Sequence, residues 1–139
     1  MPDRPGILFT AFEPSGDALA APLIAALKAR DPELPIHALG GARMAEAGAE
    51  LIERTTDDAA MLAGAAKQVL IHRRRLRRIK AWLAEHPITA AVPTDSPAAN
   101  WSVCQAVRDA QPRASIVHLA APQLWAWGAW RIGKLRRLT

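Results

Sequence analysis

Cysteine is nearly absent from this chain of 139 residues, in which Cys104 stands alone. One thiol can form neither a disulfide within the chain nor a zinc site of the usual cysteine count. Long apolar runs are absent too: the longest, Ala18–Leu27 and Ile88–Pro93, fall well below the roughly 18 residues of a membrane span. The first residues lack an apolar stretch behind a basic start, so no secretory signal is expected. We therefore expect a cytoplasmic protein of one domain.

The net charge of +5 hides an uneven distribution. Residues 1–66 hold five basic and ten acidic residues, whereas residues 67–139 hold thirteen and three. The first half therefore carries −5 and the second half +10. A basic half of this kind is compatible with binding phosphate groups, an anionic membrane surface or nucleic acid, and equally with a solvated surface that binds nothing.

Short apolar runs alternate with longer helical patterns along the chain. The sequence predicts strands at 6–12, 35–39, 50–53, 88–93 and 115–119. It predicts helices at 18–30, 42–47, 58–85 and 98–110, and a last helix from Trp125 onward. This alternation is typical of βαβ units and indicates an α/β fold, a Rossmann-like parallel sheet with helices on both faces.

Ligands of such folds bind beyond the carboxyl ends of the strands, and this rule selects four segments. They are Glu13–Asp17, Gly40-Gly41, Asp95–Asn100 and Ala120–Trp127. Glu13 and Asp95 both follow buried strands, and two carboxylates that converge there can provide a general base with a perturbed pKa. The alternative is that Asp95 caps the next helix and Glu13 is a solvated turn residue.

Ser15, Gly16 and Asp17 stand where a helix opens. Ser15 suits the N-cap, Gly16 permits a close approach of the backbone, and Asp17 complements the positive end of the helix dipole. An anionic or sugar ligand at this helix start is the functional alternative. Gly40-Gly41 resembles a phosphate-binding turn only in part, because the full GxGxxG pattern is missing.

The segment His72–Lys80 is strongly basic and belongs to a predicted amphipathic helix. The apolar positions of that helix, Val69, Leu76, Ile79 and Leu83, fall on one narrow stripe. Such a helix either lies on anionic lipid or packs on the sheet with its charges in water.

Three of the five tryptophans, Trp125, Trp127 and Trp130, fall within six residues. Indole rings can stack on a sugar, anchor at a membrane interface or fill a core. The histidines show no metal-ligand spacing, and Cys104 is expected in the core.

Taken in order, these motifs resemble the amino-terminal part of the bacterial lipid-A-disaccharide synthases, which are glycosyltransferases of the two-domain GT-B fold. The matching stretches run over essentially the whole chain: Glu13–Asp17, Leu23–Lys28, Gly40–Met44 with Gly48, Asp95–Pro97 with Asn100, and Pro122–Trp127 with Arg131. The resemblance implies an incomplete amino-terminal acceptor-binding domain over residues 1–139. It also implies that a carboxyl-terminal nucleotide-sugar domain is supplied in cis or in trans, and that this fragment alone is inactive.

The family joins UDP-2,3-diacylglucosamine to 2,3-diacylglucosamine 1-phosphate through a β-1,6 linkage and releases UDP. The resemblance implies that Asp95 and Glu13 are catalytic, with Asp95 as the base on the acceptor hydroxyl. It implies substrate-binding roles for Ser15, Gly16, Asp17, Gly40, Gly41, Met44, Asn100, Trp125, Trp127 and Arg131. It implies no metal, no cofactor, and a peripheral location at the cytoplasmic face of the inner membrane, with its anionic surface as a partner.

The chain departs from the family pattern at several positions, which leaves open a diverged paralogue with another substrate. Ala98-Ala99 replace an acid and an aromatic residue, and Gly64–Lys67 lacks a glutamate of the family. Two other function classes remain open: a basic module that binds nucleic acid through Arg73–Lys80, and a peripheral membrane-binding domain without chemistry. No helix-turn-helix pattern or aromatic platform accompanies the basic helix, so no nucleic-acid partner is expected.

Overall fold

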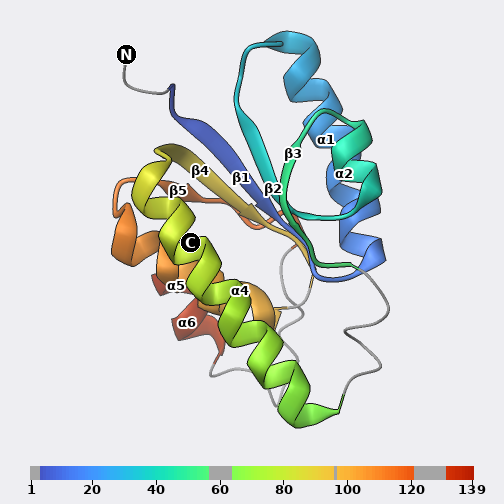
Figure 1. Ribbon diagram of the computed structural model, residues 1–139. Helices are drawn as coiled ribbons and strands as arrows, with labels where there is room; N and C mark the ends of the chain where they lie inside the picture. Colours follow the sequence, from blue (N-terminus) through green and yellow to red (C-terminus); the bar gives the residue numbers. More distant parts are fainter. Residues whose placement is uncertain (1–3, 57–63, 96, 121–130) are drawn as a thin grey trace.

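Five parallel strands form the centre of the structure, a computed structural model that describes residues 4–56, 64–95, 97–120 and 131–139 (Figure 1). The strands are β1 (Gly6–Thr10), β2 (Ile36–Gly40), β3 (Glu50–Arg54), β4 (Ile88–Pro93) and β5 (Ser115–Ile116). They lie in the order β3-β2-β1-β4-β5, and each pair of neighbours is parallel. The predicted Rossmann-like α/β sheet is therefore confirmed.

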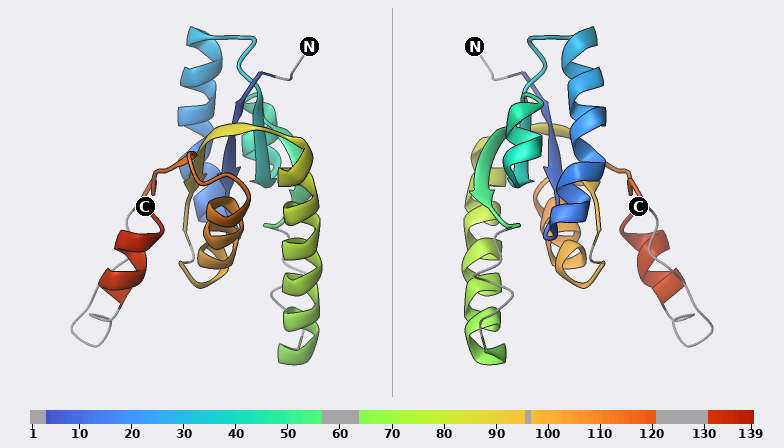
Figure 2. Two further views of the ribbon diagram at one scale, coloured as in Figure 1. Left: turned by 90° about the vertical axis from the view of Figure 1, so that its left-hand side faces the viewer. Right: turned by 90° about the vertical axis from the view of Figure 1, so that its right-hand side faces the viewer.

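Helices cover both faces of this sheet (Figure 2). The helices α1 (Pro14–Arg30) and α2 (Ala42–Glu46) pack on one face, and α4 (Ala65–Glu85) and α5 (Pro97–Ala110) on the other. The short helix α6 (Arg131–Arg137) follows, and Leu138 joins the core of α4 and α5. In β1, Leu8 points into this core, whereas its neighbour Phe9 points into the core under α1. A strand buried on both faces needs apolar residues in succession, which is why β1 is a continuous apolar run.

The helix α1 begins four residues earlier than the sequence predicted. Its first helical residue is Pro14 and its N-cap is Glu13, so the expectation that Ser15 is the N-cap was wrong. Proline is favoured at this place because the first helical N–H has no partner within the helix and proline lacks that N–H. The helix also continues through Pro22.

The last strand is shorter than expected. β5 has two residues instead of the five predicted, although the N–H groups of Val117 and Leu119 still donate to the carbonyls of Ala91 and Pro93 in β4. Residues 58–63 and 125–130, which the sequence assigned to helices, lie outside the described residues.

A buried carboxylate joins α1 to α2. Asp17 is 6% exposed; its Oδ1 accepts hydrogen bonds from the N–H groups of Gly41 and Met44, each 3.0 Å away, and its Oδ2 accepts one from Arg43 at 3.1 Å. Asp17 therefore caps the amino terminus of α2 from another helix. A side chain at position 41 has no room, since a Cβ there would lie 2.4 Å from Thr56 Oγ1.

We expect Asp17→Ala to lower the free energy of unfolding by roughly 2–3 kcal/mol, because it leaves buried N–H groups without an acceptor. Asp17→Asn should cost about half as much, since it keeps one oxygen for Gly41 and Met44 and loses the acceptor for Arg43. Urea denaturation measures both losses, with Glu46→Ala, an exposed change on α2, as the control. A loss for Asp17→Ala no larger than that of the control would contradict the capping role.

Candidate functional site

The carboxylate of Asp95 connects the carboxyl ends of β1 and β4. Its Oδ2 accepts hydrogen bonds from the backbone N–H groups of Phe12 and Glu13, both at 2.8 Å. Asp95 has a φ of +64°, a left-handed conformation that aspartate adopts more readily than most residues. The structure thus brings the backbone of Glu13 to the Asp95 carboxylate at the carboxyl end of the sheet. That the two carboxylates act together in catalysis stays a prediction.

Gly16 allows the first turn of α1 to lie against this carboxylate. A Cβ at position 16 would stand 2.2 Å from Asp95 Oδ2, closer than any two such atoms approach. The glycine is therefore required by the position of the carboxylate. Ser15, beside it, is exposed.

Asn100 holds the same carboxylate from the other side. Its side chain is 1% exposed, and its Nδ2 donates to the Thr94 carbonyl at 2.6 Å and to Asp95 Oδ1 at 3.3 Å. Its Oδ1 accepts a hydrogen bond from the Thr10 hydroxyl. The Thr94 hydroxyl in turn donates to the Thr10 carbonyl at 2.6 Å. The Asn100 amide is buried and its hydrogen bonds go to groups of the protein, one of which is the Asp95 carboxylate, so Asn100 orients Asp95.

Burial raises the pKa of the Asp95 carboxyl to about 6. Three hydrogen bonds act against this rise, from the N–H groups of Glu13 and Phe12 and from the Asn100 amide, while the charge of Glu13 adds to it. A carboxyl with a pKa close to neutrality is a stronger base than an ordinary aspartate and still loses its proton at pH 7. Asp95 therefore has the properties of a general base.

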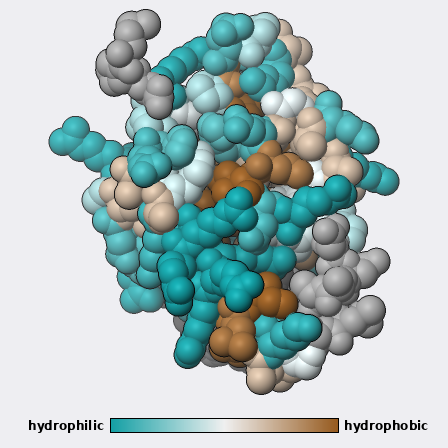
Figure 3. Space-filling model, viewed as in Figure 1, coloured by the Kyte–Doolittle hydropathy of each residue, from teal (hydrophilic) through white to brown (hydrophobic). Residues whose placement is uncertain are grey.

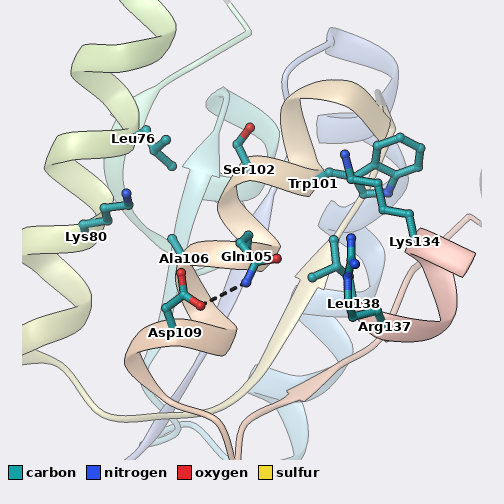
Figure 4. A pocket seen from close by; sticks show the side chains of 10 residues that line it. All are labelled: Leu76, Lys80, Trp101, Ser102, Gln105, Ala106, Asp109, Lys134, Arg137 and Leu138. Atoms are coloured by element: carbon teal, nitrogen blue, oxygen red, sulfur yellow. Dashed lines mark hydrogen bonds between the residues drawn. The ribbon is translucent and has the colours of Figure 1, made fainter. Parts of the chain in front are cut away.

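A pocket of about 350 Å³ lies on the face of the sheet that α4 and α5 cover. Lys80, Trp101, Lys134 and Arg137 are among the residues that line this groove between α4, α5 and α6 (Figure 4). Cys104, also on α5, is 2% exposed, and burial raises the pKa of its thiol to about 11. Cys104 is confirmed as a core residue.

A second pocket, of about 240 Å³, lies beside Asp95. We call it the α4 pocket; it is lined by Phe12, Thr55, Gln68, Ile71, His72, Arg75 and Ala99. Arg75 Nε donates to Glu53 Oε2 at 2.6 Å, and Arg78 approaches the other oxygen of Glu53 at 3.4 Å. The sequence drew attention to the basic run that contains His72 and Arg75, but not to their place in a pocket.

The other predicted site residues fall into two groups. Asp17, Gly40, Gly41 and Met44 form the buried joint between α1 and α2, at the carboxyl end of β2. Trp125 and Trp127 lie outside the described residues, and Arg131 is the first residue of α6. Substrate binding by all of these residues stays a prediction. In the described part of the chain, no three His, Cys, Asp or Glu side chains are grouped so that they could hold a metal.

The first residues of α4, 65–70, are all exposed. Val69 and Leu70 are 50% and 62% exposed, although both are apolar. On the face that Figure 3 shows, small hydrophobic areas interrupt a largely hydrophilic surface. Among the described residues, no helix combines the length and the apolarity that crossing a bilayer requires.

The raised pKa of Asp95 predicts how stability depends on pH. The folded chain keeps the Asp95 proton up to about pH 6, whereas the unfolded chain releases it near its ordinary pKa of 3.8. Folding therefore takes up a proton between these values, and this group's contribution to stability falls as the pH rises through them. We expect the free energy of unfolding of the wild type, relative to Asp95→Asn, to decrease between about pH 4 and pH 7. Urea denaturation across that range measures it, and a constant difference would refute the raised pKa.

Comparison with known proteins agrees with the sequence resemblance. Residues 7–139 match the family model described as lipid-A-disaccharide synthetase. The curated lipid-A-disaccharide synthase of Coxiella burnetii is 31% identical over 132 residues, which cover 94% of this chain and 35% of that protein. Those of Burkholderia cenocepacia and Myxococcus xanthus are 35% and 32% identical, over 94% and 99% of this chain.

Among solved structures, the carboxyl-terminal domain of a hydrogenase from Pyrococcus furiosus resembles the fold. The TM-score is 0.58 at 8% identity, over 85% of this chain and 95% of that one, which indicates a common fold and nothing about function. The chain spans about a third of the length of the curated relatives it matches. Since the family model covers nearly all of its residues, the chain belongs to the lipid-A-disaccharide synthase family.

Proposed function

We propose that the chain is the acceptor-binding part of a glycosyltransferase that forms the lipid A disaccharide. The donor is UDP-2,3-diacylglucosamine, the acceptor is 2,3-diacylglucosamine 1-phosphate, and the product is β-1,6-linked. One observation carries the proposal: in a chain of this family, the Asp95 carboxyl has its pKa raised to about 6 and stands beside a pocket at the carboxyl edge of the sheet. This is the edge where parallel α/β folds bind ligands.

Asp95 acts as the base that activates the acceptor. The 6-hydroxyl of the acceptor gives its proton to the Asp95 carboxylate while its oxygen forms a bond to the anomeric carbon of the donor. The bond from that carbon to the UDP oxygen breaks, and UDP leaves with the electron pair. A primary alcohol is a poor nucleophile until its proton is accepted, which is the task of this carboxylate. Burial is the main cause of the raised pKa of Asp95, and the negative charge of Glu13 adds to it.

The donor needs a nucleotide-sugar site, which we assign to polypeptide beyond these residues. The chain corresponds to about a third of its relatives' length, and residues 1–139 serve as the acceptor domain. The nucleotide-sugar domain is supplied in cis or in trans, and residues 1–139 alone have no transfer activity. No metal or cofactor takes part in this scheme.

The exposed part of α4 attaches the domain to the cytoplasmic face of the inner membrane. Val69 and Leu70 are apolar and exposed, and three exposed cations stand near them on the same helix, Lys67, Arg73 and Arg74. An amphipathic basic helix binds anionic lipid through its buried apolar area and through its charges. Membership of a lipid-A-disaccharide synthase family favours this partner over nucleic acid.

We expect Asp95→Asn to lower kcat by about 10²- to 10⁴-fold, the usual contribution of a general base. Wild-type turnover should fall as the pH drops through about 6, because Asp95 then takes up a proton. Glu13→Gln should lower turnover and move this acid limb to lower pH, since the charge of Glu13 raises the pKa of Asp95. The measurement is UDP release by a protein that includes the nucleotide-sugar domain.

Asp109→Asn is the matched control, because it removes an exposed carboxylate from α5, the helix that follows Asp95. It should leave both kcat and the pH profile unchanged. Turnover that remains at the wild-type level in Asp95→Asn and in Glu13→Gln would show that the assigned roles are wrong.

Val69→Asp and Leu70→Asp should each weaken binding to anionic vesicles by roughly tenfold or more, because each removes an apolar side chain from the contact. Co-sedimentation with vesicles that contain phosphatidylglycerol measures the change at low salt. Leu19→Asp, an exposed apolar position on α1 at the opposite face, is the control and should have no effect. Equal binding of all three variants would exclude α4 as the attachment site.

A further inference from the structure

The α4 pocket contains a guanidinium that is held in place before any ligand arrives. The side chains of Arg75 and Glu53 are only 18% and 23% exposed, and Arg75 Nε donates to Glu53 at 2.6 Å. A guanidinium has five N–H donors in a rigid plane, so this bond fixes its orientation and leaves the terminal nitrogens for another acceptor. In the described part of the structure, Glu53 is the acceptor that Arg75 contacts.

The charges around this guanidinium favour an anion. Glu53 is shared between Arg75 and Arg78, whose terminal nitrogen lies 3.4 Å from it, so two cations face one carboxylate. His72 and Gln68 add polar atoms to the same pocket, whereas the Thr55 hydroxyl donates to the Ala11 carbonyl within the protein. Two oxygens of a phosphate can accept a pair of parallel hydrogen bonds from the fork of an arginine. The polar lining is therefore suited to a phosphate group.

The other lining residues, Phe12, Ile71 and Ala99, offer apolar carbon to a ligand. The volume of about 240 Å³ corresponds to about eight water molecules at ~30 Å³ each. This space holds a phosphate and the adjoining part of a sugar ring, but not two acyl chains. The chains of a lipid in this pocket must lie outside it, and the exposed residues Val69 and Leu70 on α4 offer apolar surface there.

The pocket is adjacent to the candidate base. Phe12 lines the pocket, and its own N–H donates to Asp95 Oδ2 at 2.8 Å. Ala99 also lines the pocket, and it belongs to the first turn of α5, the helix that follows Asp95. In a hexosamine 1-phosphate, C1 carries the phosphate and C5 carries the CH2OH group with the 6-hydroxyl, and these two carbons flank the ring oxygen. The 6-hydroxyl therefore lies within the width of one sugar ring from the phosphate. With the phosphate in the α4 pocket, we expect this hydroxyl to face Asp95, because Phe12 connects the pocket to that carboxylate.

We propose that the α4 pocket binds the phosphate of a sugar 1-phosphate and that Arg75, oriented by Glu53, is its anchor. This inference rests on the proposed function and deepens it, because it assigns the acceptor's phosphate to the α4 pocket. It makes Arg75 the residue that distinguishes a phosphorylated acceptor from an unphosphorylated one.

The test is an NMR titration of the 139-residue chain with glucosamine 1-phosphate at about pH 7.5, where the phosphate is dianionic. Amide signals of residues around the α4 pocket should shift, and Arg75→Gln should weaken binding by roughly tenfold or more, as expected for a lost charge-assisted hydrogen-bond pair. Arg77→Gln, which removes an exposed cation from the same helix, should retain wild-type affinity. The double variant Glu53→Gln/Arg75→Gln leaves no unpaired carboxylate and should bind as poorly as Arg75→Gln.

Two further ligands identify the source of the phosphate. Glucosamine without phosphate should bind wild type and Arg75→Gln equally weakly, and UDP should shift the pocket signals less than glucosamine 1-phosphate does. Tighter binding of UDP would assign the pocket to the donor and overturn the inference. Equal affinity of wild type and Arg75→Gln for glucosamine 1-phosphate, or no binding at all, would also overturn it. None of these results bears on turnover in Asp95→Asn, which tests the proposed function separately.

Discussion

The candidate site at the carboxyl end of the sheet depends on one interaction, between the Asp95 carboxylate and the backbone N–H groups of Phe12 and Glu13. It joins two strand ends that are more than 80 residues apart in the sequence. To reach these N–H groups, Asp95 takes a left-handed backbone conformation, and α1 must present a glycine at position 16. The remaining oxygen of Asp95 then needs a donor, which Asn100 supplies. This half-buried carboxylate thus determines the residue types at positions 16 and 100, on two separate helices.

Two aspartates near this edge accept backbone hydrogen bonds, yet only one remains available for chemistry. Both oxygens of Asp17 are occupied by the N–H groups that open α2, and the side chain is 6% exposed. Asp95 is only half-buried, and its Oδ1 has a single long contact with Asn100, at 3.3 Å. A carboxylate with this pattern keeps an oxygen that can accept a proton. The difference in role follows from the number of donors that the surrounding backbone directs at each group.

The sequence predicts the sheet, most element bounds and the meeting of Glu13 with Asp95, because these follow from apolar periodicity and from the geometry of parallel strands. It does not predict that Asp17 caps α2, since its three partners lie 24 to 27 residues away and belong to another helix. Nor does it predict that Asn100 is buried. Thr10 offers a weak signal, since a hydroxyl at the end of an apolar strand needs a partner when it is buried. The α4 pocket has no sequence signal, because its lining residues come from four separate segments.

The length of α4 explains why one helix contributes to the core, to a pocket and to an exposed surface. Its 21 residues extend over about 32 Å, whereas strands of five or six residues extend over about 17–20 Å. The carboxyl-terminal part, with Ile79 and Leu83, covers the sheet. The amino-terminal part projects beyond the carboxyl ends of the strands, as Figure 1 shows, and forms one wall of the α4 pocket. Because this part has no sheet beneath it, Val69 and Leu70 remain exposed. A ligand with a polar head and apolar chains can therefore place its head in the α4 pocket and its chains on the exposed apolar side chains of the same helix.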